Sequence, residues 1–185
     1  MISVAKKPSV NLIDIFPIKF VHIKVNNWEE KKKKILSNMG DLKTIPKGEF
    51  VESNFFECLK EEGKDLMDVR SILKEELTEF MQLAGKAAVY GSWIERSTKG
   101  MFHDIHNHGS IGYSAVCYVS YDSSIHTSTQ FISPFNDPVT GEVIKCGLSI
   151  EEGDLILFPS NMHHYTLPNQ SDTERIVLSF NLKCL

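Results

Sequence analysis

Short runs of β-branched and aromatic residues, separated by turn-forming residues, fill the chain after Gly91 and constrain its fold more than any other feature. Seven such runs occur: SWIERSTK, IGYSAVCYVSY, TSTQFIS, EVIKCGLSI, LILFPS, HHYTLP and ERIVLSFNLKCL. The segments between them are rich in Gly, Pro, Asn and Asp, which adopt turn conformations that β-branched residues resist. This pattern predicts short strands that form a jelly-roll barrel.

The first 90 residues show helical periodicity instead. The segment FPIKFVHIKV (16–25) alternates loosely and predicts one strand, and Asn27 is placed to cap a helix over WEEKKKKIL whose lysines we expect to face solvent. A long amphipathic helix is predicted further on, because apolar residues recur there every three or four positions. These residues are Leu66, Val69, Leu73, Leu77, Phe80 and Ala84.

Together the two halves predict a mainly β protein with N-terminal helices, an α+β arrangement. A chain of 185 residues is typical of a single domain, here 1–185, since domains average roughly 150 residues. Residues 91–185 are expected to form a double-stranded β-helix, the jelly-roll or cupin-like barrel. Residues 1–90 are expected to supply a strand and a helical buttress for it.

Charge and composition restrict the partners. Lys and Arg number 20 against 24 Asp and Glu, a net charge of -4, which argues against a nucleic-acid partner; the run Lys31–Lys34 is interpreted as a solvated helix face. The four cysteines include no CxxC pair, and no apolar run is long enough for a signal peptide or a membrane span. We therefore expect a cytoplasmic protein without membrane contact, and the sequence leaves a homo-oligomer open.

Histidines cluster in two short stretches after Gly91. His106 and His108 are separated by one residue, so both side chains would leave the same face of an extended backbone and could bind one metal ion. His164 follows the apolar run LILFPS and a polar turn, which could bring its imidazole across the barrel. His106, His108 and His164 are therefore the predicted metal ligands.

At these residues the chain resembles a known family. The segments IHNHGSIGYSAVCYV, IEEGDLILFPSNMHHYTLPN and ERIVLSFN resemble the Fe(II)- and 2-oxoglutarate-dependent oxygenase superfamily, in particular its phage and bacterial branch, over about residues 91–185. The resemblance implies that His106, His108 and His164 bind Fe(II) and act in catalysis. It also implies that Arg175 holds a carboxylate of the co-substrate 2-oxoglutarate.

Position 108 departs from the family pattern. Most members of the superfamily that the chain resembles have the motif HxD at this point, whereas this chain has HNH, with His108 in place of the aspartate. A histidine in place of the aspartate leaves one more positive charge on the metal uncompensated. Asp104 lies two residues before His106 and could supply a ligand instead, although we favour His108. The choice between His108 and Asp104, and the identity of the metal as iron, stay open at this point.

Side chains of the strand that contains Arg175 alternate between its two faces, and the polar residues on one face favour a ligand site there. Arg175, Val177, Ser179 and Asn181 would share one face of ERIVLSFN, and this polar set could line the barrel interior. Tyr118, on the strand after the HxH motif, could donate a hydrogen bond to the co-substrate through its phenol. Arg175, Tyr118, Ser179 and Asn181 are therefore the predicted co-substrate residues.

The resemblance implies a dioxygenase, and specifically a hydroxylase. Such an enzyme couples oxidative decarboxylation of 2-oxoglutarate to oxidation of an unidentified substrate by O2.

Two other functions compete with it. One is a cupin-type protein or enzyme with a three-histidine metal site and no 2-oxoglutarate, although the glutamate expected in the first cupin motif is missing and a cupin does not require Arg175. The other is a metal-free β-barrel used for binding or structure.

Overall fold

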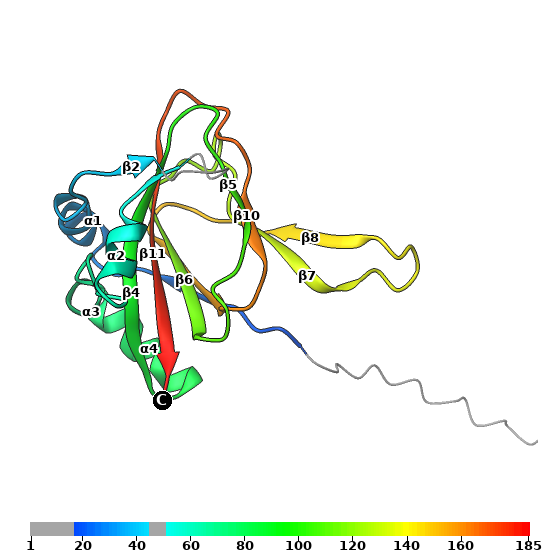
Figure 1. Ribbon diagram of the computed structural model, residues 1–185, viewed down its shortest axis with the longest axis horizontal. Helices are drawn as coiled ribbons and strands as arrows, with labels where there is room; N and C mark the ends of the chain where they lie inside the picture. Colours follow the sequence, from blue (N-terminus) through cyan, green and yellow to red (C-terminus); the bar gives the residue numbers. More distant parts are fainter. Residues whose placement is uncertain (1–16, 45–50) are drawn as a thin grey trace, which may run out of the picture.

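The computed structural model describes residues 17–44 and 51–185 and consists of two β-sheets with helices against one of them (Figure 1). The strands are β1 (Val21–Lys24), β2 (Lys43–Thr44), β3 (Glu52–Ser53), β4 (Ala87–Ser97), β5 (His103–His106), β6 (Gly112–Ser120), β7 (Gln130–Asn136), β8 (Val143–Gly147), β9 (Asp154–Pro159), β10 (His164–Thr166) and β11 (Arg175–Cys184). The helices are α1 (Trp28–Ser37), α2 (Phe55–Lys60), α3 (Val69–Ile72) and α4 (Lys74–Ala84).

The two sheets differ in size and are both antiparallel. The larger sheet has the order β1-β9-β6-β11-β4-β3-β2, and the smaller has the order β5-β10-β7-β8. The mainly β, jelly-roll class predicted from the sequence is confirmed, but the sheets do not close into a barrel, because each keeps two edge strands. The hairpin of β7 and β8 projects away from the rest of the molecule (Figure 1).

Strand β11 lies between β6 and β4 and separates two hydrophobic clusters. Its residues Ile176, Leu178 and Phe180 belong to the cluster shared with the helices. Val177 belongs instead to the cluster between the sheets, which includes Phe131 of the smaller sheet. The alternation predicted for ERIVLSFN is therefore confirmed, because successive side chains of a strand point to opposite faces.

The predicted long helix is wrong in one respect: the segment forms two helices. The Asp65 carboxylate accepts hydrogen bonds from the backbone N–H groups of Val69 (2.9 Å) and Arg70 (3.0 Å), so α3 begins at Val69 and Leu66 lies before it. Leu73 then leaves helical geometry, with φ -105° and ψ 30°, and α4 follows. The apolar stripe still covers the larger sheet, as expected, because Leu73 packs in the same cluster as Phe180 of β11.

The helix predicted after Asn27 is confirmed as α1, with two differences in detail. Asn27 adopts a left-handed conformation and its side chain makes no capping hydrogen bond. Lys31 does not face solvent: its side chain is 11% exposed and its Nζ lies 2.9 Å from Oε1 of Glu76, which is fully buried on α4. The same oxygen accepts a hydrogen bond from the backbone N–H of Asn26.

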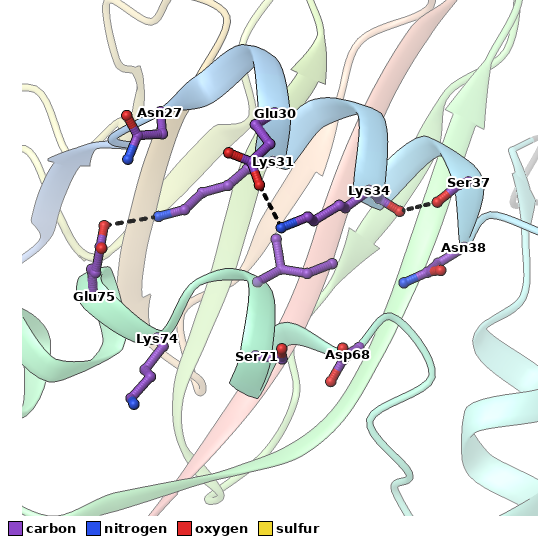
Figure 2. A pocket seen from close by; sticks show the side chains of 11 residues that line it. Asn27, Glu30, Lys31, Lys34, Ser37, Asn38, Asp68, Ser71, Lys74 and Glu75 are labelled. Atoms are coloured by element: carbon purple, nitrogen blue, oxygen red, sulfur yellow. Dashed lines mark hydrogen bonds and ion pairs between the residues drawn. The ribbon is translucent and has the colours of Figure 1, made fainter.

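Lys31 also borders a hollow of about 550 Å³ between α1 and the α3–α4 segment. Figure 2 shows Lys31 of α1 paired with Glu75 of α4 across this hollow, and Lys34 paired with Glu30 along α1 itself. The hollow lies on the helical face, and its lining includes none of the predicted metal ligands or co-substrate residues. Within residues 17–44 and 51–185, no helix has the length and apolar character needed to cross a bilayer.

Substitution of Lys31 tests the contact between α1 and α4. Lys31→Ala leaves the carboxylate of Glu76 buried without its cation, so we expect the free energy of unfolding to fall by about 3 kcal/mol. Lys33→Ala removes an exposed lysine from the same helix and should change it by less than about 0.5 kcal/mol. Urea denaturation of both variants measures the difference, and equal losses would show that the buried pair does not hold the helices together.

Candidate metal centre

The structure brings together the three histidines that the sequence predicted. His106 ends β5, His108 lies in the turn that follows, and His164 begins β10. Strands β5 and β10 are paired with His164 directly opposite His106. One ligand atom from each of the three imidazoles lies within 4.8 Å of the other two.

Hydrogen bonds fix the turn after β5 against the segment that leads to His164. The backbone N–H of His108 donates to the carbonyl of Ser160 at 2.8 Å. The Asn107 amide donates to Nε2 of His163 at 3.0 Å. The strand β5 itself ends at His106, so His108 lies just beyond it. These contacts hold the segment after β5 where His108 lies beside the other two histidines.

Two of the imidazoles are oriented by backbone carbonyls. Nδ1 of His106 lies 2.8 Å from the carbonyl of Asp104, and Nδ1 of His164 lies 2.9 Å from the carbonyl of Met162. A carbonyl only accepts, so Nδ1 is the protonated nitrogen and Nε2 has the free electron pair that a metal ligand needs. Burial, and after it the positive charge that His106 would have if protonated, lowers the pKa of His164 to about 2. His164 is therefore neutral at physiological pH.

Asp104 does not join this group. It is exposed, and its Oδ1 accepts a hydrogen bond from the backbone N–H of Ile105 at 2.7 Å. Among the described residues, the group able to hold one metal ion consists of His106, His108 and His164. Nitrogen ligands of this kind suit zinc, copper, iron and nickel.

Arg175 lies at the start of β11 and lines the same narrow cavity as the three histidines. It is 4% exposed, and its Nε and Nη2 have no hydrogen-bond partner among the described residues. A buried donor without an acceptor costs about 1–3 kcal/mol, and more when the group is charged. A guanidinium in this position is therefore suited to an anionic ligand, and its planar fork matches a carboxylate.

The other predicted co-substrate residues divide into two groups. Ser179 lines the cavity. Tyr118 is buried, but its hydroxyl donates to Oγ1 of Thr129 and accepts from the backbone N–H of Thr129, both at 3.1 Å. Asn181 accepts a hydrogen bond from the hydroxyl of Ser114 at 2.7 Å. Thr129 and Ser114, which sequence reasoning missed, both line the cavity, whereas Tyr118 and Asn181 lie behind them.

Sequence reasoning also missed a buried pair beside the histidines. Glu95 of β4 and His103 of β5 both line the cavity, and Nδ1 of His103 lies 3.0 Å from Oε2 of Glu95. One signal was available in the sequence: Glu95 lies two residues from Trp93 and two from Ser97, so a strand places all three on one face. In the structure all three are buried. A charged residue on the buried face of a strand indicates a specific partner.

A family model described as "Putative 2OG-Fe(II) oxygenase" matches residues 91–181, a segment that contains the three histidines and Arg175. The chain belongs to the 2OG-Fe(II) oxygenase superfamily. This family is named for Fe(II) and for the co-substrate 2-oxoglutarate, and its members are oxygenases. No curated protein sequence matches the chain significantly.

Solved structures of 2OG-Fe(II) oxygenases share the fold. The chain is similar to the epimerase SnoN of nogalamycin biosynthesis, with a TM-score of 0.65 and 13% identity over 90% of this chain and 79% of that one. It is also similar to the viral collagen prolyl hydroxylase of Paramecium bursaria Chlorella virus-1, with a TM-score of 0.60 and 14% identity over 90% and 96%. A prolyl-4-hydroxylase of Pseudomonas putida gives a TM-score of 0.60 at 12% identity over 91% and 94%.

Removal of one imidazole tests the metal centre. We expect His164→Ala to lose Co(II) or Ni(II) binding, because two imidazoles remain of three, while its far-ultraviolet circular dichroism stays that of the wild type. Asp104→Asn should bind the metal as the wild type does. Isothermal titration calorimetry measures both variants. Full binding by His164→Ala, or loss of binding in Asp104→Asn, would contradict this ligand set.

Proposed function

We propose that the chain is an Fe(II)- and 2-oxoglutarate-dependent dioxygenase that hydroxylates a substrate whose identity is open. His106, His108 and His164 would hold Fe(II), and Arg175 would anchor the far carboxylate of 2-oxoglutarate. When bound, Fe(II) and 2-oxoglutarate supply the oxidation, in which O2 is consumed and 2-oxoglutarate is decarboxylated to succinate.

Arg175 is the observation that carries this proposal. Its guanidinium is buried, has unpartnered Nε and Nη2 groups, and lines one cavity with the three imidazoles. A ligand that chelates a metal at one end and presents a carboxylate at the other satisfies both groups at once. A three-histidine cupin without 2-oxoglutarate has no use for such an arginine.

The remaining polar residues of the cavity would position the co-substrate. Ser179 and Thr129 both line the cavity, and Tyr118 holds Thr129 in place through two hydrogen bonds. Asn181 acts one step further back, by accepting the hydroxyl of Ser114. Tyr118 and Asn181 would therefore orient residues that contact the co-substrate.

The cavity is narrow. It encloses about 20 Å³, which is room for about one water molecule. Binding of 2-oxoglutarate would therefore require the side chains along it to move apart. The new contacts of Arg175 would offset the cost of that movement, because its unpartnered donors gain an acceptor.

Two similar structures support the choice of ligand. The viral collagen prolyl hydroxylase was determined as a complex with 2-oxoglutarate, and HygX from Streptomyces hygroscopicus was determined with nickel and 2-oxoglutarate bound. HygX has a TM-score of 0.63 and 14% identity over 90% of this chain and 83% of that one.

Titration of 2-oxoglutarate into the metal-loaded protein tests the role of Arg175. With Fe(II) under anaerobic conditions we expect a visible charge-transfer band that saturates as 2-oxoglutarate chelates the metal. Arg175→Ala should weaken this binding by about 10- to 100-fold, the worth of hydrogen bonds to a charged group, while metal affinity is kept. Arg96→Ala removes an arginine of β4 that pairs with Glu52 and is the matched control.

The outcomes separate the competing functions. Equal 2-oxoglutarate affinity in the wild type and Arg175→Ala would show that Arg175 does not hold the carboxylate of 2-oxoglutarate. Tight metal binding without a charge-transfer band would favour the three-histidine cupin. A wild-type chain that binds no metal would leave the metal-free β-barrel.

A further inference from the structure

A path of aromatic rings connects the surface of the molecule to the proposed metal centre. It begins at Phe56 and Phe55 of α2, whose ring centroids are 5.8 Å apart. Phe55 meets Trp93 of β4 edge to face at 4.9 Å, and the ring of Trp93 lies 5.5 Å from that of His108. Four rings from three parts of the chain therefore lead inward to one of the three candidate metal ligands.

The exposure of these rings rises from the interior outward. Trp93 is 2% exposed, Phe55 is half-buried and Phe56 is 45% exposed. Leu59 follows Phe56 by three residues on the same side of α2 and is 54% exposed. A single exposed apolar side chain is ordinary, but an apolar face that continues through ring contacts to a metal ligand indicates a surface for a ligand.

Hydrogen bonds hold the rings in place. Asn54, which precedes α2, accepts the backbone N–H of Ile94 at 2.9 Å through its Oδ1, and the hydroxyl of Ser53 donates to the carbonyl of Ile94 at 2.8 Å. These contacts fix the start of α2 against β4. The indole Nε1 of Trp93 donates to Oε1 of Glu95 at 2.8 Å. A surface that is fixed in advance loses little conformational freedom when a ligand binds, which favours affinity.

The elements around the rings have charged side chains that pair with each other. Nε of Arg96 lies 2.6 Å from Oε2 of Glu52, and Nζ of Lys43 lies 3.4 Å from Oε1 of Glu57 on α2. Further in, the guanidinium of Arg175 and a divalent ion on the three histidines would both repel a cation. An anion that paired with Arg175 would compete with the co-substrate, so the rings are best suited to a neutral ligand.

We propose that Phe55 and Phe56 bind the substrate of the oxygenase, and that this substrate has a neutral aromatic group several bonds away from the carbon that is oxidised. The inference rests on the proposed function, because it takes the metal on His106, His108 and His164 as the place of reaction. Aromatic pairs contribute more than the apolar area that they bury, and a saturated ring of similar size lacks this contribution.

The probe 4-phenylbutan-1-ol tests the inference, because it is neutral and its chain separates a phenyl ring from a carbon that can reach the metal. Saturation-transfer NMR measures its binding to the Zn(II)-loaded protein with 2-oxoglutarate present. We expect Phe56→Ala to weaken binding by about 2- to 10-fold, the worth of one aromatic contact. Leu83→Ala, which removes a 76% exposed side chain from α4, is the control and should bind the probe as the wild type does.

Two further comparisons define the ligand and its position. The wild type should bind 4-cyclohexylbutan-1-ol and 4-phenylbutylammonium more weakly than 4-phenylbutan-1-ol, because the first lacks an aromatic ring and the second carries a positive charge. In the Co(II)-loaded protein the methylene protons beside the hydroxyl should relax faster than in the Zn(II)-loaded protein, since this end of the probe lies near the paramagnetic ion.

Equal binding of 4-phenylbutan-1-ol by the wild type and Phe56→Ala would overturn the role of the rings. Tighter binding of the cyclohexyl or the ammonium compound would overturn the neutral aromatic class, and equal relaxation with Co(II) and Zn(II) would show that the ligand does not reach the metal. If the Fe(II)-loaded wild type still gives the charge-transfer band with 2-oxoglutarate, such results contradict this inference alone. A wild type without that band contradicts the proposed function, and this inference with it.

Discussion

Strand β11 is the element on which the rest of the structure depends. It pairs with β4 on one side and β6 on the other, and its alternating side chains serve both faces of the larger sheet. Ile176, Leu178 and Phe180 bury their apolar surface under the helices, while Arg175 and Ser179 line the cavity. Because one strand holds both sets, the hydrophobic burial that attaches the helices also keeps a guanidinium inside the protein, where its burial would otherwise be unfavourable.

The cavity exists because the two sheets meet over it. The smaller sheet supplies His106 and His164 through the pairing of β5 with β10, and the larger sheet supplies Arg175 and Glu95. The cavity therefore contains the guanidinium of Arg175 and the carboxylate of Glu95, both buried, beside the three candidate metal ligands. Opposite charges at this depth interact more strongly than they would at the surface, since water screens them less. Their placement, rather than any single residue, distinguishes this site from a collection of buried histidines.

Much of this arrangement could be predicted from the sequence, and the failures have physical causes. The strand runs, the helix after Asn27 and the alternation around Arg175 follow from local periodicity, and all three are confirmed. The division of the predicted helix at Leu73 was missed, because its apolar spacing continues unbroken through the residue where the backbone leaves helical geometry. Glu95 was missed because the value of a buried carboxylate depends on its partner His103, which lies in a short polar strand without apolar alternation.

The sequence by itself determined the mainly β class, the two histidine stretches and the residue types available to a metal and a carboxylate. These follow from side-chain periodicity and turn chemistry, which act between near neighbours in the chain. Only the tertiary structure decided that His108 rather than Asp104 joins His106 and His164, that Tyr118 and Asn181 lie behind the cavity wall, and that the sheets stay open. Each of these depends on the register between strands distant in the sequence, which is set by packing of whole sheets and not by any local pattern.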